Sequence, residues 1–111
     1  MREEIPEYVL CSAVWYKDLE LKKPEILAIR GISPYNVDRG IVFSGWRHGN
    51  CIYQMCAITG LRSIPAHVGE EVQGFLSSRN RFLTREEAAE LALERGQIDK
   101  PKRILFSEDV W

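Results

Sequence analysis

Arg47, His48 and Asn50 lie within four residues of one another and bring together a guanidinium, an imidazole and a carboxamide. Gly45 precedes them and Gly49 lies among them, where a predicted strand runs into the predicted start of a helix. Glycine lets the backbone approach a ligand closely, and the free N–H groups of a helix start attract anions. Arginine adds a planar fork that fits phosphate oxygens. The segment therefore predicts an anion or nucleotide contact, although its spacing is neither that of a P-loop nor that of a Rossmann fingerprint.

A second group of polar residues is flanked by two aromatic residues. Phe75 and Phe82 enclose a turn that contains Asn80 and Arg81. Aromatic rings beside arginine can stack on a base, while a carboxamide reads a polar edge. Two structural roles compete with this interpretation, since Phe75 also fits the core and Phe82 also fits a hydrophobic staple before the next helix. Together with the first group, the turn favours a small nucleotide ligand.

The case for catalysis is weaker than the case for binding. Cys51 and His48 could form a thiolate–imidazole pair at a helix start, but no third group is placed to orient them, so we favour a buried, structural Cys51. Adjacent glutamates such as Glu70 and Glu71 point in different directions and make poor acid–base partners. The sequence has no Cys-x-x-Cys, and its two histidines are not at helical spacing, so we expect no metal site and no cofactor.

The composition indicates an ordinary globular chain. A length of 111 residues predicts one domain over residues 1–111, which begins with a polar leader over residues 1–7. Fifteen basic and sixteen acidic residues give a net charge of −1, which argues against a general binder of duplex DNA. No run is long enough to cross a bilayer, and no secretory signal accompanies the three cysteines. We therefore expect a cytoplasmic protein with free thiols.

Hydrophobic periodicity and breaker residues predict an α+β fold. Two helices are expected. The first runs over residues 51–59, with Asn50 as its N-cap and Gly60 after its end, and the second runs from a capping box at Thr84 and Glu87 to about Arg95. The predicted strands cover residues 8–16, 26–29, 40–44, 72–77 and 103–106, and residues 61–69 are expected to form a loop. The arrangement we predict is one mostly antiparallel sheet of four to five strands with two helices packed on one face.

Five segments together resemble a family of small proteins from bacteriophages and prophages. They are residues 9–16, 45–52, 73–82, 96–98 and 105–109. The family looks like the first type of anti-Thoeris proteins, which sequester cyclic ADP-ribose signals, and in some members cyclic oligonucleotides, without cleaving them. The resemblance implies a homo-oligomer, a dimer or built from dimers, with ligand pockets between protomers in the cytoplasm of an infected bacterium.

The resemblance also implies roles for individual side chains. Arg47 would clamp the diphosphate, Phe75 or Phe82 would stack on adenine, and Asn80 would read a polar edge. With His48, Asn50 and Arg81 these residues make up the predicted ligand-binding set. A chain this short has little room for a private cleft, which favours a pocket shared between copies.

Two other functions remain open. One is a nucleotide or ADP-ribosyl hydrolase that uses His48 or Cys51. The other is a phage interaction protein that binds a host protein through Trp15, Trp46 and Trp111. The sequence does not indicate which cyclic nucleotide is bound, how many subunits assemble, which protomer supplies each contact, or what residues 19–39 do.

Overall fold

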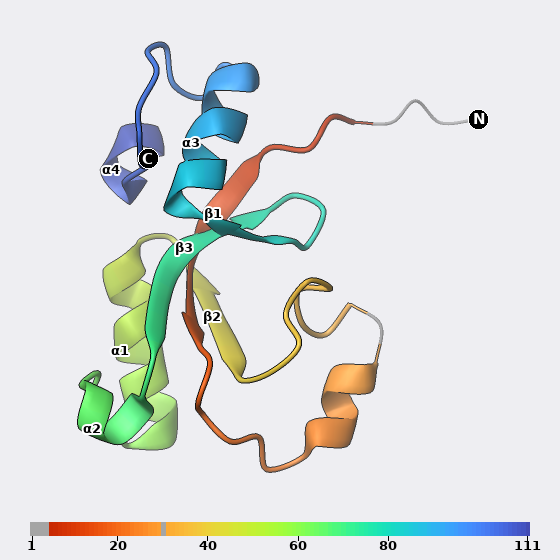
Figure 1. The fold of residues 1–111 in the computed structure, drawn as a ribbon, viewed down its shortest axis with the longest axis vertical. Helices are drawn as coiled ribbons and strands as arrows, with labels where there is room; N and C mark the ends of the chain where they lie inside the picture. The colour runs from red at the N-terminus through yellow and green to blue at the C-terminus, as the bar shows by residue number, and fades with distance from the viewer. Residues whose placement is uncertain (1–4, 30) are drawn as a thin grey trace.

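A computed structural model describes residues 5–29 and 31–111, and residues 1–4 of the predicted leader lie outside that range. The chain forms a four-stranded sheet with helices and belongs to the α+β class, as predicted (Figure 1). None of the described helices has the length and apolar character needed to span a bilayer. The elements are β1 (Val9–Tyr16), η1 (Pro24–Ala28), β2 (Ile41–Gly45), α1 (His48–Thr59), α2 (Pro65–Val68), β3 (Glu71–Ser77), β4 (Phe82–Thr84), α3 (Arg85–Glu94) and α4 (Ser107–Val110).

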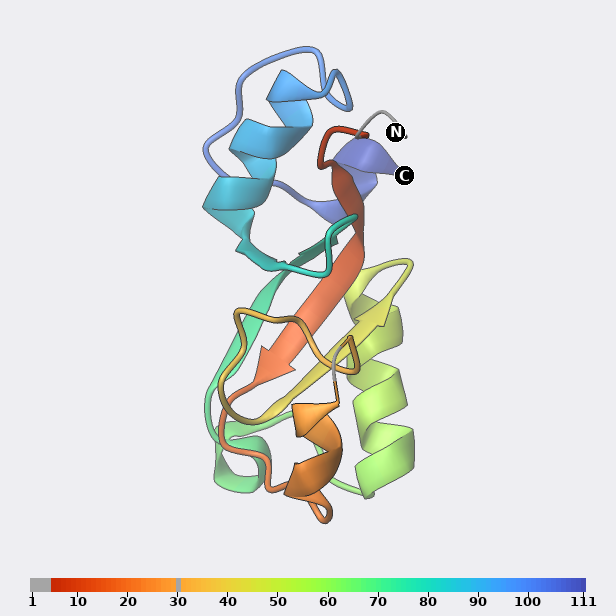
Figure 2. The ribbon, with the colours of Figure 1, turned by 90° about the vertical axis from the view of Figure 1, so that its right-hand side faces the viewer.

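The sheet has the order β2-β1-β3-β4, and all its neighbours are antiparallel. In the pairing, Val14 lies opposite Phe43 on one side and Gln73 on the other. Figure 2 shows β3, β1 and β2 side by side across the sheet. The central strand β1 is therefore paired along both edges, which matches its run of aromatic and β-branched residues.

Two hydrophobic clusters lie where helices cover the sheet. One joins Val14 and Tyr16 of β1 to Cys51 and Met55 of α1. The other joins Phe75 of β3 and β4 to the alanine-rich side of α3 and to the C-terminal segment. Because Phe75 lies opposite Ser12, which alternates in step with Val14 and Tyr16, both helices pack on the same face of the sheet.

The segment from residue 31 to residue 39 crosses the opposite face of the sheet (Figure 2). The Asn36 carboxamide accepts a hydrogen bond from Phe82 N–H at 2.8 Å and donates to the Phe82 carbonyl at 2.9 Å. The Trp15 indole donates to the Arg39 carbonyl at 2.8 Å. This segment therefore fixes β4 and β1 from the side that the helices leave open.

Two local predictions of helix ends are confirmed. Thr84 Oγ1 accepts from Glu87 N–H, and the Glu87 carboxylate accepts from Thr84 N–H, which is the predicted capping box. Gly60 follows α1 in a left-handed conformation with φ of 74°. The prediction of Asn50 as N-cap was wrong. Helix α1 begins three residues earlier than expected, so Asn50 occupies its first turn, and Asn50 Oδ1 accepts from Arg47 N–H at 3.0 Å.

Three other local predictions were wrong: two where a short helical turn formed within the expected element, and one where the expected strand did not form. Residues 26–29 were expected to be a strand but lie largely within η1, and residues 61–69 contain α2. Pro24 and Pro65 begin these turns, where the fixed φ of proline is already suitable for a helix. The predicted strand over residues 103–106 is absent, and α4 follows instead. Its start is held by the Asp109 carboxylate, which accepts from Phe106 N–H at 2.8 Å.

Candidate functional site

Three helices begin around one cavity of about 440 Å³. Their first residues, His48 of α1, Arg85 of α3 and Ser107 of α4, all line it. The other lining residues are Arg47, Gly49, Asn50, Tyr53, Gln73, Phe106 and Glu108. Three of the seven predicted ligand-binding residues, Arg47, His48 and Asn50, are therefore brought together here.

Arg47 is held at the start of α1 by contacts with the C-terminal segment. Its Nη2 donates to the main-chain oxygen of Trp111 at 2.6 Å, and its guanidinium lies 4.6 Å from the centre of the Trp46 ring. Its Nε is buried and has no hydrogen-bond partner among the described residues. A buried donor without a partner costs about 1–3 kcal/mol, so such groups are rare unless something outside the chain satisfies them.

Arg85 repeats this pattern from the other side of the cavity. Its Nη2 donates to Gln73 Oε1 at 2.6 Å, its guanidinium lies 5.3 Å from the centre of the Phe106 ring, and its Nε is also buried without a partner. Neither Arg47 nor Arg85 forms an ion pair with an Asp or Glu side chain of the described residues, although Glu108 lines the same cavity. The cavity therefore carries two guanidinium groups that no acidic side chain of the described residues neutralises by direct contact.

His48 positions this wall of the cavity and adds no positive charge at neutral pH. Burial lowers the pKa of the imidazole below its usual 6.5, an effect that the hydrogen bond to the Gly74 carbonyl opposes and Arg85 reinforces. The Nε2 atom lies 2.7 Å from that carbonyl oxygen. A neutral ring must carry its proton on Nε2 to make this bond, so His48 donates to Gly74 and ties α1 to β3.

Gly74 is required at this junction. A Cβ at this position would lie 2.2 Å from the Leu83 carbonyl oxygen and 2.7 Å from the Phe82 ring. Any larger residue would therefore push β4 away from β3.

Cys51 has the surroundings of a structural cysteine. It is fully buried, and its Sγ lies within hydrogen-bond range of the Ser12 and Arg47 carbonyl oxygens. Burial, with a smaller contribution from Cys11, raises the pKa of its thiol to about 11. A nucleophilic cysteine needs the opposite shift, so these surroundings disfavour the thiolate that the hydrolase alternative requires.

The stacking roles predicted for Phe75 and Phe82 are not compatible with their burial. Phe75 is completely buried between the His48 ring, at 5.0 Å, and the Trp111 ring, at 6.0 Å. Phe82 is 5% exposed and meets Trp15 edge to face at 5.6 Å. Neither ring presents a free face to a base, because both are buried against other aromatic side chains.

Asn80 and Arg81 lie in the β3–β4 turn and do not line the cavity. Asn80 Nδ2 donates to the Ser33 carbonyl at 3.0 Å. The Arg81 fork donates to both oxygens of Glu7, at 3.1 Å and 2.9 Å, and this contact raises the pKa of Arg81 and lowers that of Glu7. The segment around Arg47 and the turn with Asn80 and Arg81 therefore do not meet at one pocket within a single chain.

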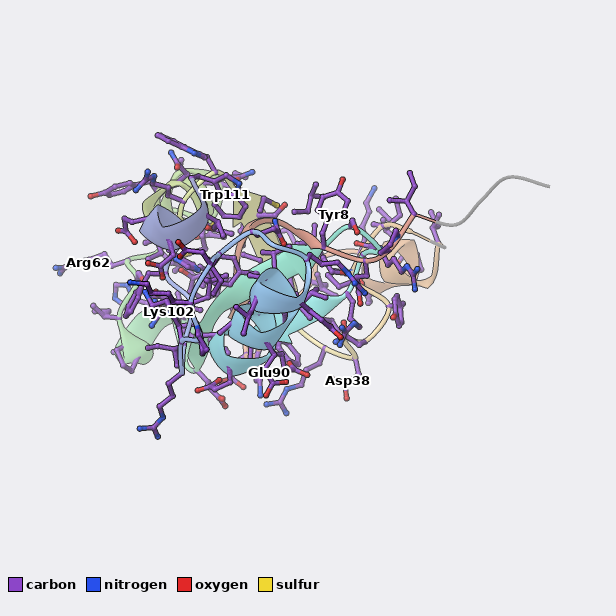
Figure 3. All side chains as sticks on the ribbon, turned by 90° about the horizontal axis from the view of Figure 1, so that it is seen from above. Tyr8, Asp38, Arg62, Glu90, Lys102 and Trp111 are labelled. Atoms are coloured by element: carbon purple, nitrogen blue, oxygen red, sulfur yellow. The ribbon has the colours of Figure 1, made fainter. Side chains whose placement is uncertain are left out.

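The two regions lie on different sides of the molecule. The cavity is next to the C-terminal segment, while the turn is bonded to residues 33–36. Viewed from above, Trp111 lies beside α4 and Asp38 lies at the opposite border (Figure 3). The three tryptophans of the interaction hypothesis are also divided. Trp46 is 62% exposed, whereas Trp15 packs on the face opposite the helices.

Sequence reasoning missed six residues that line the cavity. These are Tyr53, Gln73, Arg85, Phe106, Ser107 and Glu108. Arg85 was visible only as a residue next to the Thr84 cap. The position after an N-cap is a helix start, so this arginine could have been recognised as a second cation at a helix N-terminus. Among the residues that the structure describes, no group of three or more His, Cys, Asp or Glu side chains could hold a metal ion.

Comparison with known proteins identifies the family. The model of the family described as "Phage T4 y16D protein" matches residues 8–111. The chain therefore belongs to this family of phage proteins. No match was found among curated proteins, nor among solved structures.

Proposed function

We propose that this phage protein binds a phosphate-bearing small molecule of the cyclic nucleotide class in the cavity around Arg47 and Arg85, and sequesters it without cleavage. Cyclic ADP-ribose-type signals are the first candidates, so the protein would act in phage counter-defence. The observation that carries the proposal is the pair of buried Nε–H groups without partners. A phosphate that engages both guanidiniums would recover the hydrogen bonds that the free chain leaves unmade.

The rest of the cavity supports an anionic ligand. The first turn of α1 contributes N–H groups and the positive end of its dipole. A volume of about 440 Å³ lies within the usual range of small-molecule sites, about 300–1,000 Å³. Glu108 is the one acidic side chain in the lining, and it opposes the two cations.

The rim supports a ligand that also has a base or another flat ring. Tyr53 is 76% exposed and Phe106 is 41% exposed, so both keep free aromatic surface at the cavity. Stacking on an aromatic side chain is worth about 1–3 kcal/mol per base. Tyr53 and Phe106 thus take the roles that Phe75 and Phe82 cannot fill.

Capture without turnover is supported by what the side chains are set up to do. Cys51 is held as a thiol, and the His48 imidazole is committed to the Gly74 carbonyl. Binding needs only preformed donors and surfaces, which the cavity supplies.

The test is capture and release. The purified chain is incubated with cyclic ADP-ribose isomers and, in parallel, cyclic dinucleotides, freed of unbound ligand, and heated, and the supernatant is analysed by mass spectrometry. We expect intact ligand to be released by wild type and by the exposed-site control Arg62→Gln, but to be much reduced with Arg85→Gln. Absence of retained ligand in every case would contradict the proposal. A converted product would favour the hydrolase.

A further inference from the structure

Two exposed strand borders in this fold are closed by carboxamide side chains that imitate a neighbouring strand. Asn36 donates to and accepts from the backbone of Phe82 on β4. Gln97 does the same for Val9 on β1, accepting from its N–H at 2.9 Å and donating to its carbonyl at 2.8 Å. Such caps occupy backbone groups that would otherwise pair with another chain.

Strand β2 forms the remaining border of the sheet (Figure 2), and no side chain of the described residues caps it in this way. The Lys17 N–H donates to the Glu70 carbonyl, so the backbone N–H and C=O groups of Lys17 point towards the β3 side of the sheet. These groups point to alternate sides along a strand, so those of Tyr16 point towards β2. Tyr16 lies opposite Ile41, and Ile41 therefore faces β1.

The same alternation fixes the direction of every backbone group in β2. Ile41, Phe43 and Gly45 point towards β1, while Val42 and Ser44 point away from the sheet. Within the described part of the chain, no group donates to or accepts from the outward N–H and carbonyl groups of Val42 and Ser44.

Nothing in the composition of β2 discourages pairing. The strand reads Ile-Val-Phe-Ser-Gly, without a charged residue or a proline, which are the usual protections of an edge. Trp46, which follows it directly, is 62% exposed. The net charge of −1 gives little repulsion between copies of the chain.

We propose that β2 pairs with β2 of a second copy in antiparallel fashion, around a two-fold axis at Phe43. In this register Val42 of one copy lies opposite Ser44 of the other, and both outward residues of each strand are used. The pattern is self-complementary, because each copy offers the same donors and acceptors in reverse order. The result is one continuous sheet through two copies, formed independently of the anion cavity.

The test removes one outward donor and nothing else. Ser44 is exposed and its N–H takes no part in the pairing with β1, so Ser44→Pro fits an edge strand and deletes only the donor used between copies. Ser44→Ala, which keeps the N–H, is the matched control. Sedimentation velocity over a wide concentration range should give twice the 12.8 kDa chain mass for wild type and Ser44→Ala, and the single chain mass for Ser44→Pro.

A measurement on wild type makes the result independent of how the proline variant folds. Amide hydrogen exchange at Val42 and Ser44 should be slow at high protein concentration and become fast on dilution. A wild-type chain that stays monomeric, as it would if this edge served an extended peptide of another protein, overturns the proposal. So does a dimer that persists in folded Ser44→Pro, or fast exchange of both amides within a dimer.

Discussion

The cavity at the helix starts and the β3–β4 turn contain the same kinds of residue in different states. Each has an arginine next to an asparagine, or close to one, and an aromatic ring nearby. In the turn, Glu7 neutralises Arg81 through two hydrogen bonds. In the cavity, Arg85 contacts the amide oxygen of Gln73 and Arg47 the main-chain oxygen of Trp111, and no Asp or Glu side chain of the described residues forms an ion pair with either. Residue type therefore does not separate a binding arginine from a structural one, whereas the partner does.

The difference has an energetic meaning. The Arg81–Glu7 pair is largely withdrawn from water, with exposed side-chain fractions of 31% and 14%, and its hydrogen bonds already contribute to the stability of the fold. The buried Nε–H groups of Arg47 and Arg85 contribute nothing to folding and carry a desolvation cost. Such groups are the ones that a ligand can stabilise.

The largest effect is expected when both cavity arginines are replaced. Arg47→Gln combined with Arg85→Gln should weaken ligand binding by about 100-fold or more, since each hydrogen bond to a charged group is worth about 1.5–3 kcal/mol. Titration calorimetry with the ligand retained by wild type measures this. The matched control is Arg81→Gln, which should bind within about twofold of wild type, well below the tenfold change that 1.4 kcal/mol produces. Equal losses in the two proteins would remove the distinction between the regions.

The reverse pattern is expected for stability. Arg81→Gln removes the ion pair with the partly buried Glu7 carboxylate, which then keeps the hydrogen bond from Ser77. It should lower the free energy of unfolding by about 1–3 kcal/mol. Arg85→Gln removes the Nη2 bond to Gln73 together with a buried donor that had no partner. Because these two effects oppose each other, the variant should change the free energy of unfolding by less than about 1 kcal/mol. Urea unfolding followed by circular dichroism gives both values. A stable Arg81→Gln beside an unfolded Arg85→Gln would reverse the assignment.

A smaller effect should appear in the acid dependence of stability. Hydrogen bonding to Arg81 lowers the pKa of Glu7 from its usual 4.5, and burial opposes this. Because the folded pKa is the lower one, the stabilisation is fully present above about pH 4.5 and is lost as the pH falls through the folded pKa. Unfolding free energies measured downward from pH 6 should show this loss in wild type and less of it in Arg81→Gln. Identical acid profiles would mean that the pair contributes no linkage.

The parts of this fold that the sequence predicted are the local ones. The Thr84 capping box and the Gly60 helix end depend on neighbours within four residues, and both are confirmed. The α+β class followed from periodicity. The short helical turns that begin at Pro24 and Pro65 were missed because a segment of four or five residues is too short to show a hydrophobic periodicity.

The candidate site was only half predictable, because residues far along the chain decide which arginines are paired and which line a cavity. The contact from Arg47 to Trp111 spans 64 residues, and that from Arg81 to Glu7 spans 74. No spacing rule reports that Glu7 reaches Arg81 while no Asp or Glu side chain of the described residues forms an ion pair with Arg47. Burial of Phe75 and Phe82 likewise depends on Trp111, Trp15 and Asn36, each far away along the chain.

The most direct measurement of the central claim is the ¹H–¹⁵N spectrum of the arginine Nε–H groups, recorded with and without the captured ligand. The Nε–H signals of Arg47 and Arg85 should shift on binding as they gain a phosphate acceptor, while that of Arg81, already bonded to Glu7, stays in place. Single Arg→Gln variants assign the signals. A bound ligand that leaves both cavity signals unmoved, or that shifts Arg81 instead, would contradict the account.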